Sequence, residues 1–381
     1  TNTPEHIRND VTALSDHRTR IIYQDEIYPN RQEATNVDTK LAVLNLSYYP
    51  QERGPYNVSA MEMNNRGELT NPKQRWAGMM RRLDNTDFEK ANIEYIQFWL
   101  MDPALTNAEG YDGELYINLG DISEDILRDG KKAFEHGLPI SDADNGRVDS
   151  TIWGYTPRTT STVVAFSNET GSRPKQDVGL NGLSTAQEKN WPIYKDYVDA
   201  LRGKVDADVL SKWQQDMFSP LNDPAGDNFH YYRGTDFDEQ QVAILARYKH
   251  YNGTEGNSPD TESQTESYGT ASTLQPDIED INNDNTLNEY EKYFQYKVIL
   301  RPDMMQVGRQ HITEKKVAKV TLRNGETQEV TWYQFKIPLK GDSADVKTVG
   351  SIRNWKSIRF MRMYLTGFEK ETHLRFATLD L

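Results

Sequence analysis

Apolar residues gather in strand-length runs near both ends of the chain, and the runs at the two ends resemble each other. Residues 93–100 (IEYIQFWL) and 358–365 (IRFMRMYL) match position by position in residue class, and both are rich in aromatic and branched side chains. Each run precedes a turn-rich gap and a second matching segment, residues 115–121 and 374–380. The recurrence predicts two related β-modules; chance similarity between amphipathic strands is the alternative.

Further strands flank both copies. Residues 41–48 and 293–300 alternate, and in the second of these Phe294, Tyr296, Val298 and Leu300 share one face. Residues 317–322 and 328–337 flank Asn324-Gly325, a pair that favours a two-residue hairpin turn. The pattern predicts a mainly β protein with α insertions, in which two β-sandwich (jelly-roll-like) modules are connected by short helices and loops.

The periodicity changes between the two modules. Asp121 and Glu124 form a capping pattern for a helix that Gly137 would end. Val209, Trp213 and Met217 are spaced as on a second helix, and a third would run from Asp236 to Tyr248. Residues 252–280 are polar and are expected to form a mobile loop. The predicted domains are therefore 1–121 and 291–381 as β-sandwich modules, with 122–290 as the connecting region.

Composition excludes several classes of protein. The net charge of −14 disfavours nucleic-acid binding, since a phosphate backbone would be repelled. The chain of 381 residues contains no cysteine, so disulfides, thiolate nucleophiles and cysteine zinc sites are excluded. No apolar run is long enough for a membrane helix, and the chain is expected to be a soluble fragment of a longer polypeptide.

Residues 280–291 reproduce the oxygen spacing of a twelve-residue calcium loop. The predicted Ca²⁺ ligands are Asp280, Asn282, Asp284, Thr286 through its carbonyl, Asn288 through a water, and Glu291. Asn285 stands where glycine usually makes the turn, although asparagine tolerates the left-handed conformation. The alternative is an Asp/Asn-rich turn capped by its own side chains. Because a strand follows the loop, a structural ion is favoured over a switch.

Other patterns give no catalytic signature. Asp142-Ala-Asp144-Asn145-Gly146 with Asp149 lacks a closing glutamate, so a plain turn is favoured there. The seven histidines are scattered, and no spacing places two imidazoles on one helix face. Neither a nucleophile elbow nor a phosphate-binding glycine loop is present. We therefore predict that the protein is not an enzyme.

Five segments together resemble the SprA/Sov family, the outer-membrane translocon of the type IX secretion system. They are residues 92–103 (NIEYIQFWLMDP), 113–130 (GELYINLGDISEDILRDG), 176–183 (QDVGLNGL), 280–296 (DINNDNTLNEYEKYFQY) and 358–367 (IRFMRMYLTG). The resemblance covers most of the chain but includes no ladder of barrel strands. It implies an inserted region of a protein whose barrel segments lie outside this sequence.

The resemblance also implies function, partners and location. Members of this family export folded proteins across the outer membrane and, in gliding species, support motility. The implied partners are exported cargo proteins, a shuttle protein at a lateral gate and a periplasmic plug. The implied location is the outer membrane, at the cell surface or on the periplasmic face. The alternative function is a calcium-dependent glycan-binding module, with Trp99, Trp153 and Trp332 as candidate stacking platforms.

Overall fold

The computed structural model describes residues 3–31, 39–127, 129–131, 138–140, 147–158, 166–167, 169–260, 278–340 and 346–381. The chain forms two compact units. Unit 1 contains residues 1–51, 71–120 and 292–381, and unit 2 contains residues 52–70 and 121–291. No helix among the described residues combines the length and the apolar character required to span a membrane.

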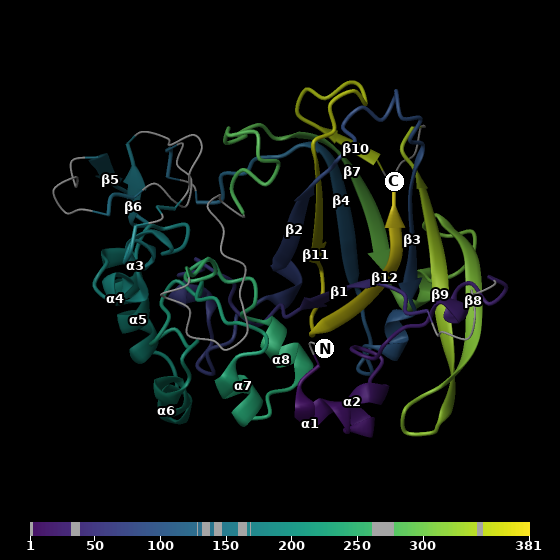
Figure 1. The fold of residues 1–381 in the computed structure, drawn as a ribbon, viewed down its shortest axis with the longest axis horizontal. Helices are drawn as coiled ribbons and strands as arrows, with labels where there is room; N and C mark the ends of the chain where they lie inside the picture. Colours follow the sequence, from purple (N-terminus) through teal and green to yellow (C-terminus); the bar gives the residue numbers. More distant parts are fainter. Residues whose placement is uncertain are drawn as a thin grey trace. The chain divides into compact units, whose positions relative to one another are not determined.

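Unit 1 is built on two five-stranded sheets (Figure 1). The first sheet has the order β1-β12-β3-β9-β8 and the second has the order β10-β7-β4-β11-β2. The strands of the first sheet are β1 (Val43–Tyr48), β12 (Thr372–Asp380), β3 (Tyr95–Met101), β9 (Thr327–Pro338) and β8 (Ile312–Thr321). Those of the second sheet are β10 (Val346–Val349), β7 (Lys292–Leu300), β4 (Gly113–Asp121), β11 (Phe360–Thr366) and β2 (Trp76–Arg82). Two short helices, α1 (Glu5–Arg8) and α2 (Val11–Ser15), precede them in the chain.

Aromatic and aliphatic side chains from both sheets form one core. Phe98 stacks on Phe335 at 4.9 Å between ring centroids and meets the ring of Phe376 edge-on at 5.4 Å. From the second sheet, Tyr296 and Ile117 belong to the same buried cluster. Period-two alternation places these residues on inward faces, as predicted for residues 293–300. The mainly β class with helical insertions is confirmed.

The strands are not arranged as two sequential modules. β3 pairs antiparallel with β12, and β4 pairs antiparallel with β11, so each sheet combines strands from 1–121 with strands from 291–381. This long-range pairing provides the matched strands with neighbours from the other end of the chain. Unit 2 lies between β4 and β7 in the chain, close to the predicted connecting region 122–290, and additionally takes up residues 52–70.

The hairpin between β8 and β9 forms as predicted, but its connection is longer than two residues. Thr321 pairs with Thr327, the Leu322 N–H donates to the Glu326 carbonyl, and Gly325 has a φ of 87°. Three residues therefore connect the closing pair, and glycine alone takes the left-handed position, as in a hairpin that ends in a bulge.

Unit 2 contains short helices and a two-stranded ribbon. They are β5 (Val148–Ser150), β6 (Tyr155–Pro157), α3 (Arg173–Gln176), α4 (Thr185–Glu188), α5 (Pro192–Arg202), α6 (Ala207–Gln215), α7 (Thr235–Glu239) and α8 (Ile244–Tyr248). Helix α5 buries Tyr194, Tyr197, Val198 and Leu201, which share one face at helical spacing. Met63 and Leu69 pack in the same cluster as Tyr197 and Leu201, which explains why residues 52–70 belong to this unit.

The predicted helices and loop of residues 122–290 are only partly observed. The predicted second helix forms as α6, but it ends at Gln215, so Met217 lies beyond it and is 51% exposed. The predicted third helix is divided into α7 and α8. The predicted helix after Asp121 is wrong over residues 122–127, because the Glu124 side chain is buried and accepts distant backbone N–H groups instead of capping a helix. Within the predicted loop 252–280, Thr254 and Ser258 are buried, while residues 261–277 lie outside the described residues.

Candidate functional site

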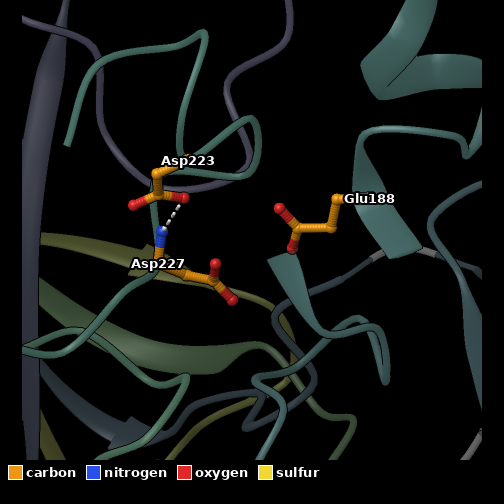
Figure 2. A group of neighbouring side chains, drawn as sticks. All are labelled: Glu188, Asp223 and Asp227. Atoms are coloured by element: carbon orange, nitrogen blue, oxygen red, sulfur yellow. Dashed lines mark hydrogen bonds between the residues drawn. The ribbon is translucent and has the colours of Figure 1, made fainter. Parts of the chain in front are cut away.

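Three buried carboxylates meet inside unit 2 (Figure 2). Glu188 is the last residue of α4, and Asp223 and Asp227 lie in the turn between α6 and α7. One carboxylate oxygen from each residue lies within 4.8 Å of the other two. The exposed fractions of these residues are 0%, 1% and 0%, so the group is withdrawn from solvent. We call Glu188, Asp223 and Asp227 the carboxylate triad.

The Asp223 carboxylate organises the turn that follows it. It accepts backbone N–H groups from Gly226 at 2.7 Å, Asp227 at 3.3 Å and Asn228 at 3.2 Å. Gly226 has a φ of 77°, a conformation that glycine adopts without strain. The Arg53 guanidinium donates to the carbonyl oxygens of Asp223 and Pro224. The turn is thus held by the Asp223 side chain at its start and by the Arg53 guanidinium, which binds its main-chain carbonyls.

Two donors fix the Glu188 carboxylate. Asn181 Nδ2 donates to Oε1 at 2.7 Å, and the Ala225 N–H donates to Oε2 at 3.1 Å. A capping box formed by Ser184 and Gln187 fixes the start of α4 at Thr185, so Glu188 lies at the end of a single helical turn. Glu188 therefore links α4 to the same turn that carries both aspartates.

Asp227 is the most enclosed member of the triad. Tyr56 Oη donates to its Oδ2 at 2.6 Å and accepts the Leu180 N–H at 2.8 Å. A Cβ at position 179 would collide with the same Oδ2, so Gly179, whose φ is 74°, makes room for the carboxylate. The other oxygen, Oδ1, is buried and accepts no hydrogen bond from the described residues.

Burial dominates the electrostatics of the triad. It raises the pKa of Glu188 and Asp223 and raises the pKa of Asp227 strongly, because the charged form loses its hydration. Nearby carboxylates, including Glu255, add like charge and raise the pKa of Glu188 and of Asp227 further. Three such groups can be accommodated by sharing protons or by holding a hard cation between them.

The predicted calcium loop forms a turn with many internal hydrogen bonds. Asp280 accepts the N–H groups of Asp284 at 2.9 Å and Asn285 at 3.1 Å. Asp284 accepts from Asn282 Nδ2 at 2.9 Å and from the Thr286 hydroxyl. Asn285 has a φ of 62°, so the left-handed conformation predicted for this position is confirmed. These hydrogen bonds are typical of the side-chain-capped turn that was the alternative to calcium.

The last two predicted ligands bond outside the loop. Asn288 Nδ2 donates to the Ile122 carbonyl at 2.6 Å, and Glu291 Oε1 accepts the Ser123 N–H at 3.3 Å. Glu124 accepts the N–H groups of Ile281 and Asn288, and burial raises its pKa to about 7. The structure therefore brings Asp280, Asn282, Asp284 and Thr286 together and directs Asn288 and Glu291 to residues 122–123. Calcium binding at 280–291 stays a prediction.

The candidate tryptophans are buried or partly buried, and the described part of the oxygen-rich segment forms ion pairs. Trp99 is 1% exposed and Trp332 is fully buried, so both pack in the core of unit 1 and cannot serve as glycan platforms. Trp153 is partly buried against a cluster that contains Leu183 and Tyr194. Of the oxygen-rich segment at 142–149, residues 142–146 lie outside the described residues, and Asp149 pairs with Lys131 and Arg158.

Sequence reasoning did not find the carboxylate triad. Glu188 is far from the two aspartates in the chain, and nothing in their spacing distinguishes them among 58 acidic residues. The available signal was Asp223-Pro-Ala-Gly-Asp227-Asn228, a turn-forming segment with two aspartates and a glycine next to the second. That signal predicts a turn, but it does not identify the third carboxylate.

Comparison with known families finds a match in the C-terminal part of the chain. Residues 196–381 match SprA_N, described as a motility related/secretion protein family. The match includes Asp223, Asp227, the 280–291 loop and strands β7 to β12. It confirms the resemblance to SprA-like proteins over residues 196–381, which contain two of the five segments that carried it. The description is that of a secretion and motility family rather than an enzyme family. No curated protein matches the chain.

Proposed function

We propose, from the membership of residues 196–381 in this SprA-like family of motility and secretion proteins, that the chain is an extramembrane region of an outer-membrane translocon. In this proposal, the translocon exports folded proteins through the type IX secretion system and supports gliding motility. The family match is the observation that carries the proposal.

The architecture of unit 1 suits a mechanical part of such a translocon. Its two sheets share a core of stacked rings, and every strand of the predicted repeat pairs with a strand from the other end of the chain. Close-packed cores of this kind resist deformation. We propose that unit 1 forms a rigid wall beside the export route and that the chain performs no catalysis. Exported cargo, the shuttle protein and the periplasmic plug are the proposed partners.

The test uses the full-length protein in cells. Phe98→Ala removes a ring that contacts Phe335 and Phe376, and it should cost about 3–5 kcal/mol of unfolding free energy in unit 1. We expect cargo secretion and gliding to decline at elevated temperature while the amount of barrel in the outer membrane is unchanged. Val317→Ala, at a side chain 52% exposed on β8, is the matched control and should secrete normally.

Deletion of residues 1–381 from the full-length protein can contradict the proposal. If a full-length protein that lacks residues 1–381 still reaches the outer membrane and exports cargo at the parental rate, the region is not part of the export machinery. Loss of secretion without loss of the barrel supports the proposal.

A further inference from the structure

We propose that the carboxylate triad of Glu188, Asp223 and Asp227 is a binding site for Ca²⁺. The site is separate in sequence from the 280–291 loop and does not depend on the proposed role in secretion. It would be a structural site, because its ligands link α4 to the turn between α6 and α7.

The first support is the unpartnered oxygen. Asp227 is fully buried, and its Oδ1 accepts no hydrogen bond from the described residues, although a buried acceptor without a partner is costly. Figure 2 shows the Asp227 and Glu188 carboxylates directed toward each other. A cation between these carboxylates would supply the missing partner.

The second support is the way the protein holds the triad. Glu188 is fixed by Asn181 and the Ala225 N–H, Asp223 is fixed by the backbone N–H groups of the turn, and Asp227 is fixed by Tyr56 on its Oδ2. Carboxylate oxygens have two lone pairs, so these hydrogen bonds orient the ligands without using their full capacity. Arg53, the cation on the turn, donates to main-chain carbonyls rather than to the carboxylates.

The chemistry of the ligands selects the ion. All three side chains offer oxygen, and neither nitrogen nor sulfur ligands belong to the group, so a hard cation is favoured over zinc or copper. Ca²⁺ binds oxygens at about 2.3–2.6 Å, so two ligands on opposite sides of the ion lie up to roughly 5 Å apart. Mg²⁺ binds at about 2.0–2.1 Å and requires a smaller octahedron. Oxygens within 4.8 Å of one another fit Ca²⁺ with little movement.

The experiment uses the 381-residue chain after treatment with a chelator. We expect saturating Ca²⁺ to raise the melting temperature by roughly 5 °C or more, and Mg²⁺ at the same concentration to raise it much less. Tb³⁺, a luminescent substitute for Ca²⁺, should bind and be excited through Tyr56, whose hydroxyl lies 2.6 Å from Asp227 Oδ2. Ca²⁺ should displace the Tb³⁺.

Variants assign the signal to the triad. Glu188→Gln and Asp227→Asn keep the size of each side chain and remove a ligand charge, and each should weaken Ca²⁺ affinity at least about tenfold. Asp284→Asn changes the predicted loop instead and should leave the high-affinity Ca²⁺ and Tb³⁺ signals unchanged. Circular dichroism at low temperature checks that each variant is folded before binding is measured.

Three results would overturn the proposal. Loss of the signal in Asp284→Asn alone would place the ion in the 280–291 loop. Equal stabilisation by Mg²⁺ would refute the assignment to Ca²⁺. An absence of any Ca²⁺ effect, together with a higher melting temperature for Glu188→Gln than for the parent chain, would show that the triad shares protons and binds no cation.

Discussion

At the scale of single residues, the structure separates positions that look alike in the sequence. Trp99 and Trp332 occupy strands that could have exposed them, and both are buried. Asp227 and Asp284 both lie in Asp/Asn-rich turns, but Asp227 is buried with a free oxygen and Asp284 is exposed. Burial distinguishes these residues, and it depends on contacts from distant parts of the chain.

His250 should make the stability of unit 2 sensitive to acid. Its ring stacks on Phe218 with centroids 3.5 Å apart, and Lys249, His230 and Arg53 place positive charge near it. Burial lowers its pKa to about 4 from 6.5. Between these values the unfolded chain binds a proton that the folded chain does not bind, so stability is full above pH 6.5 and falls as the pH drops toward 4.

His250→Phe preserves the stacking and removes the titration. We expect the loss of unfolding free energy between pH 7 and pH 4 to be smaller in this variant than in the parent chain, by at most about 2 kcal/mol after allowance for partial exposure. Urea unfolding at a series of pH values measures the difference. Equal losses in the two proteins would show that His250 does not contribute to acid sensitivity.

At the scale of elements, the repeat in the sequence appears as two interlocked halves. The two halves correspond strand by strand: β1 to β7, β2 to β9, β3 to β11 and β4 to β12. When each strand is replaced by its counterpart, the order β1-β12-β3-β9 of the first sheet becomes β7-β4-β11-β2, which is the order in the second sheet. Each half contributes strands to both sheets. A half on its own would leave strand edges unpaired in both sheets, which explains why the repeat does not produce two separate sandwiches.

The β8–β9 hairpin allows a test at this scale. Gly325 has a φ of 87°, and a Cβ there would meet no atom within 4 Å, so a substitution changes only the backbone strain. Gly325→Ala should cost about 1 kcal/mol of unfolding free energy. Gly325→Asn should cost less, because asparagine tolerates the left-handed region. Urea denaturation measures both variants, and an equal cost for Ala and Asn would contradict this explanation.

At the scale of the whole molecule, unit 2 is inserted into the sequence of unit 1 at two points, residues 52–70 and 121–291, of which the second is the longer. The chain leaves unit 1 at Gly120 and returns at Lys292, and a Cβ at position 120 would collide with the Lys292 carbonyl. Strands β4 and β7 are neighbours in their sheet. A short turn could therefore join the two strands directly.

We predict that unit 1 folds without unit 2. The variant joins Gly120 to Lys292 through a short glycine-containing turn and replaces residues 52–70 with a Gly/Ser linker of equal length, which removes Met63 and Leu69. It should show a β-type circular dichroism spectrum and a cooperative thermal transition. Phe98→Ala in this background should lower stability by about 3–5 kcal/mol, as expected for a formed core. A non-cooperative transition would show that unit 1 requires unit 2.

The sequence by itself determined the local properties of this protein. Strand-length runs of aromatic and branched residues, and the alternation at residues 293–300, predicted β1, β3, β4, β7, β9, β11 and β12 close to their observed bounds, because such side chains suit a pleated, buried surface. β8 begins at Ile312, ahead of the predicted 317–322. Asn285 and Gly325 predicted left-handed turns for a similar local reason. β2 was missed because most of its residues are exposed and it shows no buried face.

Only the tertiary structure decided which strands pair, where the units divide and which carboxylates meet. The partners of β3 and β4 come from the far end of the chain, and residues 52–70 join unit 2 through Met63 and Leu69. Glu188 reaches Asp223 and Asp227 by the folding of α4 against a distant turn. These contacts depend on the burial of surfaces that are far apart in sequence, so residue spacing along the chain does not predict them.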